Sequence, residues 1–188
     1  MRKRSCTVAL TLMGTAFILA GCKEETTDAA AFPDVASCRA EAERGNLNFT
    51  AADCDNAFAT AQADYAETAP RYDALAVCEE EHGAGNCTQA AQSGGGFSFM
   101  PLLAGFMIGQ MLGGRGGFMS QPLVKTPNGR FSTPGGTSVA TNSGTGKMNA
   151  QAFQKAPTTA GRPAMSRADV ASRGGFGSSS AARSSYGG

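Results

Sequence analysis

Histidine is almost absent from this 188-residue chain, and the side chains that usually carry out enzyme catalysis do not form a recognisable cluster in its sequence. His82 is the only histidine, and no nucleophile–base pair is recognisable around it. The stretch NSGTGKMN, residues 142–149, is not a phosphate-binding loop, because Met148 stands where such a loop requires Ser or Thr. We therefore expect no enzyme activity, no catalytic residue and no cofactor.

The N-terminus lacks an apolar run long enough to span a membrane comfortably. Residues 1–22 read MRKRSCTVALTLMGTAFILAGC, three cations followed by an uncharged run, which is the pattern of a secretory signal. Leu19-Ala20-Gly21-Cys22 has the form of a bacterial lipobox, where cleavage after residue 21 leaves Cys22 carrying acyl chains such as palmitate. Lys23, rather than Asp, follows, which favours an outer-membrane anchor on the periplasmic side. The alternative is an ordinary signal peptide with a chance cysteine.

Four cysteines remain after export: Cys38, Cys54, Cys78 and Cys87. An even number in an exported chain predicts two disulfides. A Cys54–Cys78 bond is not expected, because Cys54 lies about 14 residues before the end of its helix and Cys78 about five residues into the next. In an antiparallel pair of helices, the two cysteines would be more than about 10 Å apart along the helix axes, too far for a disulfide. We expect Cys38–Cys54 and Cys78–Cys87, which have no such mismatch. The helix geometry excludes only the one of the three possible pairings that contains Cys54–Cys78. A metal site of Cys78, His82 and Cys87 is the competing interpretation, but it lacks a close Cys-x-x-Cys pair, so we expect no metal.

Acidic residues are nearly missing from the C-terminal part. Residues 23–93 hold 14 acidic and four basic side chains, whereas residues 115–188 hold nine basic side chains and the single acid Asp169. A split of this kind indicates segments with different partners. Because the chain is exported, the RGGF repeats at 115–118 and 173–176 do not predict nucleic-acid binding. We expect contacts with an anionic envelope polymer, an envelope protein, or the chain's own acidic part.

The organisation predicted from composition is mainly α. Helices are expected over 34–45, 50–68 and 73–83, with a last short turn in NCTQAAQ, residues 86–92. Residues beyond 125 contain too few apolar side chains to offset the entropy of ordering. The expected segments are a signal peptide (1–21), a tether (22–33), a disulfide-linked acidic helical module (34–92), an apolar Gly-rich segment (93–124) and a basic disordered tail (125–188).

Residues 99–117 carry glycine at every fourth position: Gly105, Gly109, Gly113 and Gly117. A glycine ridge with this spacing is how helices approach closely in membranes. We expect a helix that dips into the anchoring membrane or packs, through Gly105, Gly109 and Gly113, on a partner's helices. A membrane-associating or self-oligomerising protein is thus the alternative to a contact-making envelope protein. A Gly-rich loop and a full membrane span are the other interpretations of this stretch.

Several of these features together resemble the YgiB-type lipoproteins of Gram-negative bacteria. They are the lipobox, two cysteine pairs flanking TAPRY (68–72), FMPLLAGFMIGQMLGG (99–114), QPL (121–123) and RGGFG (173–177). The resemblance covers most of the mature chain. It implies a location in the Gram-negative envelope and, because that family has no assigned function, adds no mechanism.

Overall fold

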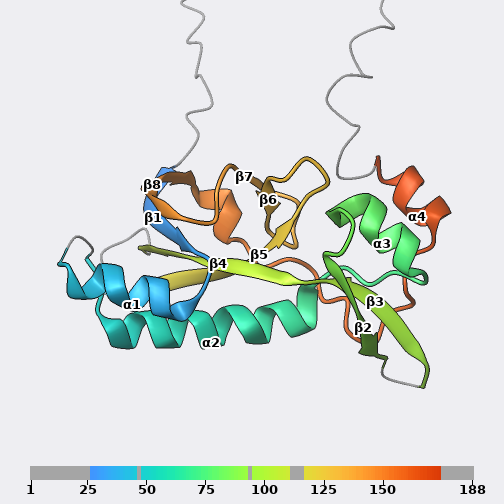
Figure 1. Ribbon diagram of the computed structural model, residues 1–188, viewed down its shortest axis with the longest axis horizontal. Coiled ribbons are helices and arrows are strands. Elements are labelled where there is room, and N and C mark those ends of the chain that lie inside the picture. The colour runs from blue at the N-terminus through green and yellow to red at the C-terminus, as the bar shows by residue number, and fades with distance from the viewer. Residues whose placement is uncertain (1–25, 46–47, 93–94, 111–116, 175–188) are drawn as a thin grey trace, which may run out of the picture.

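A six-stranded antiparallel sheet is the centre of the molecule (Figure 1). The computed structural model describes residues 26–45, 48–92, 95–110 and 117–174. The strands lie in the order β7-β6-β5-β4-β1-β8, so that β1, from the start of the described chain, pairs between β4 and β8. Their bounds are β1 (Thr26–Phe32), β4 (Leu103–Gln110), β5 (Phe118–Lys125), β6 (Phe131–Ser132), β7 (Ser138–Val139) and β8 (Gly144–Asn149).

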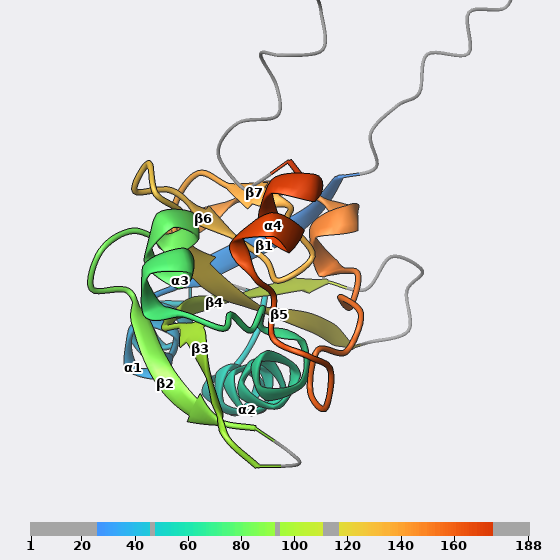
Figure 2. The same ribbon diagram turned by 90° about the vertical axis from the view of Figure 1, so that its right-hand side faces the viewer.

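Helices cover one face of this sheet and one end of the molecule. α1 (Val35–Glu43) and α2 (Ala51–Thr68) lie beneath the sheet in Figure 1. At the end of the molecule that faces the viewer in Figure 2, α3 (Leu75–His82) and α4 (Arg167–Ser172) stand above a hairpin of β2 (Cys87–Ala91) and β3 (Phe97–Pro101). A 3-10 helix, η1 (Ala150–Phe153), packs on the other face of the sheet. The expectation of a mainly α fold is therefore wrong.

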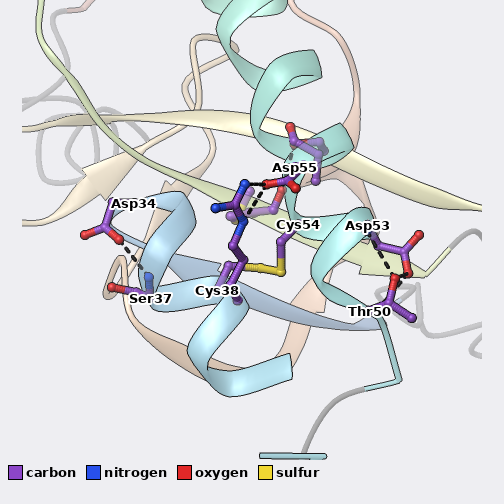
Figure 3. The surroundings of a disulfide bond; sticks show 11 residues. Asp34, Ser37, Cys38, Thr50, Asp53, Cys54 and Asp55 are labelled. Atoms are coloured by element: carbon purple, nitrogen blue, oxygen red, sulfur yellow. Dashed lines mark hydrogen bonds and ion pairs between the residues drawn. A yellow bond between two sulfur atoms is a disulfide. The ribbon is translucent and has the colours of Figure 1, made fainter. Parts of the chain in front are cut away.

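The three helices begin close to where the sequence signals place them. Ser37 N donates to the Asp34 carboxylate at 2.7 Å, and this bond lowers the pKa of Asp34. Thr50 and Asp53 form a reciprocal capping box at the start of α2 (Figure 3). α3 differs, because its N-cap is Ala74 without a side-chain bond, rather than the expected Asp73.

Disulfides join Cys38 to Cys54 and Cys78 to Cys87, the same pairs as expected from the sequence. The first links α1 to α2, with Cα atoms 5.8 Å apart (Figure 3). Arg39, the residue after Cys38, donates from Nε to the Asp55 carboxylate at 2.7 Å. The second links α3 to β2, with Cα atoms 6.2 Å apart. The expected helical turn at residues 86–92 is wrong, since this segment is strand β2, paired with β3.

Gly105 and Gly109 of the glycine ridge lie on strand β4, not on a helix. Phe106 and Ile108 pack toward α1 and α2, whereas Met107 packs on the opposite face of the sheet. A strand covered on both faces is apolar at nearly every position, so its sequence has no alternation that would distinguish it from a buried helix. A repeat of four residues also keeps glycines on one face of a strand, because side chains alternate with a period of two.

The structure of β4 explains why two of these positions require glycine. Gly105 stands at a register shift with a φ of +140°, and a Cβ there would come within 2.4 Å of the Phe32 carbonyl oxygen. At Gly109, a Cβ would come within 2.6 Å of the Phe153 ring. Gly113 lies outside the described residues. The expected helix over 99–117 is therefore wrong for residues 99–110, which lie in β3 and β4 apart from Leu102 between them, whereas residues 111–116 lie outside the described residues. The membrane association or self-association expected from that helix loses this structural basis and stays untested.

The tether and the tail are also corrected. β1 lies within the expected tether 22–33 and is central in the sheet. Within the expected disordered tail 125–188, the described part forms β6, β7, β8, η1 and α4. Composition underestimates this order because the few apolar residues of the segment, among them Val139 and Phe153, are buried on a sheet made by other parts of the chain.

Candidate functional site

Tyr72, just after α2, is the point where three distant segments meet. Its backbone exchanges hydrogen bonds with Phe99 of β3, at 2.8 and 2.9 Å. On its other side, Met165 N donates to Arg71 O at 2.8 Å and Asp73 N donates to Met165 O at 3.0 Å. The segment leading to α4 is thereby held in parallel against residues 71–73.

The segment between η1 and α4 is also attached to the end of α2. Thr159 donates from its N to Glu67 O at 2.8 Å and from its hydroxyl to Ala69 O at 2.6 Å. Lys155 Nζ lies 2.8 Å from the Asp64 carboxylate and 2.9 Å from that of Glu67, and hydrogen bonds with these two groups raise the pKa of Lys155. This segment is consequently a fixed wall, ordered by contacts with residues about 90 positions earlier.

A buried hydrogen-bond chain lies beneath this wall. His82 Nδ1 is 2.7 Å from Lys125 O, and His82 Nε2 is 2.8 Å from the Tyr72 hydroxyl. Because a carbonyl only accepts, the proton is on Nδ1, and Nε2 accepts from Tyr72. Both side chains are fully buried; burial lowers the pKa of His82, although the bond to Lys125 opposes the shift, and burial raises the pKa of Tyr72.

Between the end of α2 and α4 the surface is hollowed into a cleft of about 610 Å³. Its apolar lining includes Pro70, Pro134, Pro163, Met165 and Val170. These residues come from the turn after α2, the β6–β7 turn, the wall segment and α4, so only the folded chain assembles the cleft.

Three guanidinium groups line the same cleft: Arg71, Arg162 and Arg173. Arg71 Nη2 donates to Ala66 O at 3.1 Å, while its buried Nε has no hydrogen-bond partner among the described residues. Arg173 Nη1 lies 3.0 Å from the sulfur of Met165. Among the ion pairs of the described residues, none includes these three arginines.

Two carboxylates, Glu81 and Asp169, also line the cleft. Asp169 accepts from Ser166 N at 2.8 Å and from the Ser166 hydroxyl at 2.7 Å, which caps α4 and lowers the pKa of Asp169. Three cations and two anions leave the cleft with an excess of one positive charge. The arrangement thus supplies guanidinium donors beside apolar walls, a combination suited to an anion with an apolar part.

The residues singled out in the sequence lie elsewhere. Cys22 falls outside the described residues, and the cysteines of the competing metal site, Cys78 and Cys87, are bonded to each other. In the part of the chain that the structure describes, His, Cys, Asp and Glu side chains do not form a metal-ligating group of three or more. None of the helices within the described ranges has the length and apolarity to cross a bilayer.

The cleft arginines were missed by the sequence analysis for identifiable reasons. Arg71 was noted only within the TAPRY stretch, and Arg162 and Arg173 fell in the segment expected to be disordered. The proline–arginine clustering in GRPA (161–164) is the one local signal that could have pointed to a structured, charged wall.

Comparison with known proteins places this chain in a family. A family model described as "Protein of unknown function (DUF1190)" matches residues 26–187. The UPF0441 protein of Pectobacterium carotovorum subsp. carotovorum (strain PC1) is 34% identical over 186 residues, covering 90% of this chain and 78% of the relative. No solved structure matches. The chain belongs to the DUF1190 family, a YgiB-type family of unknown function, as the sequence resemblance indicates.

Proposed function

We propose that this chain is an exported, lipid-anchored protein of the cell envelope that acts by binding rather than by catalysis. The observation that carries the proposal is the lipobox ending at Cys22, directly after an uncharged run preceded by three cations. The disulfides support it, because cysteine pairs of this kind persist in oxidising compartments and are rare in the cytosol. β1 begins at Thr26, so the anchor would stand only four residues from the central sheet.

Labelling with radioactive palmitate tests the anchor. Cys22→Ser removes the thiol that would receive the acyl group, so we expect no label and an unprocessed or soluble protein. Cys6→Ser is the matched control, because Cys6 lies in the same leader but outside the lipobox, and it should leave labelling unchanged. Label that persists in Cys22→Ser would overturn the lipid anchor.

The outer membrane, on its periplasmic side, is the proposed location, and Lys23 is the residue that supports it. Exchanging Lys23 for Asp should retain the protein at the inner membrane while leaving palmitate incorporation unchanged. Density-gradient separation of the two membranes measures the distribution. An unchanged outer-membrane distribution in the variant, or an inner-membrane location of the unaltered protein, would contradict this assignment.

The cationic C-terminal half supports contacts with an anionic envelope polymer or an envelope protein. Part of its charge pairs internally: Lys147 with Asp28 at 3.3 Å, and Arg167 with Glu80 at 2.6 Å. Exposed Lys125 and Arg130 have no ion pair among the described residues and remain for an external partner. Chemical crosslinking in intact envelopes identifies that partner. Crosslinks to foreign molecules support this role, whereas crosslinks only between copies of the chain would indicate a homo-oligomer instead.

A further inference from the structure

We propose that the cleft between the end of α2 and α4 binds a small organic anion, a single carboxylate or phosphate group on a compact apolar body. The proposal does not depend on lipid anchoring, because every residue that lines the cleft lies between Thr68 and Arg173. Three features of the cleft carry it: guanidinium groups without ion pairs to the described residues, a buried donor without an acceptor among them, and apolar walls of suitable size.

The first feature is the set of guanidinium groups that line the cleft. Elsewhere in the C-terminal half, Lys147, Lys155 and Arg167 each pair with a carboxylate of the acidic half. Arg71 and Arg162 come from different halves of the chain and face one cleft without such a partner among the described residues. The fold therefore gathers cations from distant parts of the chain around one cleft, which favours the binding of an anion there.

The second feature is the Nε of Arg71. It is buried and has no hydrogen-bond acceptor in the described part of the protein. An unsatisfied buried donor on a charged group is costly, and native structures rarely retain one without a reason. Guanidinium groups bind carboxylate and phosphate oxygens through paired N–H donors, and Arg71, which lines the cleft, has such a donor without an acceptor among the described residues.

The third feature limits the size and charge of the ligand. The volume of about 610 Å³ lies within the roughly 300–1,000 Å³ range of small-molecule sites, and prolines, Met165 and Val170 form apolar walls. Because Glu81 and Asp169 share the cleft with three arginines, the excess is a single positive charge. A ligand with one anionic group and an apolar body matches this balance better than a polyanion does.

Isothermal titration calorimetry of the full chain in a neutral detergent tests the proposal with four probes of similar apolar size. These are butanoate, butyl phosphate, butanol and butylammonium, each titrated also into protein-free detergent. We expect butanoate or butyl phosphate to bind, and their relative affinity to identify the preferred anionic group. Butanol should bind at least about tenfold more weakly, because it lacks the charge-assisted bonds. Binding of neither anion, or equal binding of butanol or butylammonium, would overturn the proposal.

Arg162→Gln is the decisive variant, because Arg162 is exposed and its side chain makes no contact that would be needed for folding among the described residues. We expect the affinity for the anion to fall about tenfold or more, while butanol binding stays unchanged. Arg44→Gln removes the same charge from an exposed position at the end of α1, outside the cleft, and should leave the affinity unchanged. Equal effects of the two substitutions would mean a non-specific charge effect and would refute the site.

Discussion

The ring of Phe153 lies so close to the backbone of Gly109 that a methyl group on Gly109 would meet the ring at 2.6 Å. Phe153 belongs to η1 and Gly109 to the central strand β4. The contact therefore packs η1, from the C-terminal half of the chain, against the sheet. Gln121 of β5 donates from Nε2 to Phe153 O at 3.3 Å, which holds the same turn from the neighbouring strand. The glycine is therefore explained by a ring packed on a strand.

Gly109→Ala should destabilise the protein by about 1–3 kcal/mol, because the added methyl overpacks the Phe153 site. Urea unfolding followed by circular dichroism measures this change. Gly146→Ala is the matched control: Gly146 lies on β8 of the same sheet, and a Cβ there meets nothing within 4 Å. It should be neutral or slightly stabilising. Equal midpoints for the two variants would contradict the packing described here.

Removing the hydroxyl group from each of two buried serines of the sheet should change the free energy of unfolding differently. Ser120 Oγ donates to Ala57 O of α2 at 2.7 Å, so Ser120→Ala should cost about 1 kcal/mol. Ser132 Oγ is buried without a partner among the described residues, so Ser132→Ala should be neutral or stabilising. Chemical denaturation of both variants decides this. A larger loss in Ser132→Ala than in Ser120→Ala would show that the assigned bonds are wrong.

Stability should decline as the pH falls below about 6.5, the ordinary pKa of histidine. Burial lowers the pKa of His82 in the folded state, so in this range the unfolded chain binds a proton that the folded chain does not. Falling pH then favours unfolding, until the folded-state pKa is passed. The free energy of unfolding, measured between pH 7.5 and 5, reports the effect.

His82→Gln is the control for this pH dependence. Glutamine keeps one donor and one acceptor for Lys125 O and the Tyr72 hydroxyl but does not titrate. The variant should be less stable at pH 7.5 because of imperfect packing, yet its stability should change little between pH 7.5 and 5. A slope as steep as that of the unaltered protein would assign the effect to other groups.

The disulfides should be recovered as Cys38–Cys54 and Cys78–Cys87 in non-reducing peptide maps. Trypsin cleaves at Arg39 between the first two cysteines, and a Glu-specific protease cleaves at residues 79–81 between the last two. A peptide joining Cys54 to Cys78 would contradict the helix arrangement. Cys38→Ala with Cys54→Ala should lower the free energy of unfolding by about 3 kcal/mol, from the chain-entropy model of a closed loop.

Features that depend on neighbouring residues were predictable from the sequence. The N-caps at Asp34 and Thr50 involve bonds that reach only three residues along the chain, and so their signals are local. The spacing of cysteines relative to helix ends likewise excluded the pairing that contains Cys54–Cys78, and the two expected pairs are those of the structure. The resemblance to a family of unknown function is confirmed by the family match.

The strands of the sheet could not be predicted from the local sequence, because the strands they pair with lie far away in the chain. β1 is a strand because β4 and β8, about 75 to 120 residues later, supply its hydrogen bonds, and its own sequence TTDAAAF has little strand character. β4 is covered on both faces, so its periodicity does not separate strand from helix. The cleft arginines likewise acquire a shared site only when residues 71, 162 and 173 are brought together. The sequence by itself determined the caps at Asp34 and Thr50, the helices α1 to α3 and the family. Tertiary structure alone decided the sheet and the cleft, because their bonds join distant segments.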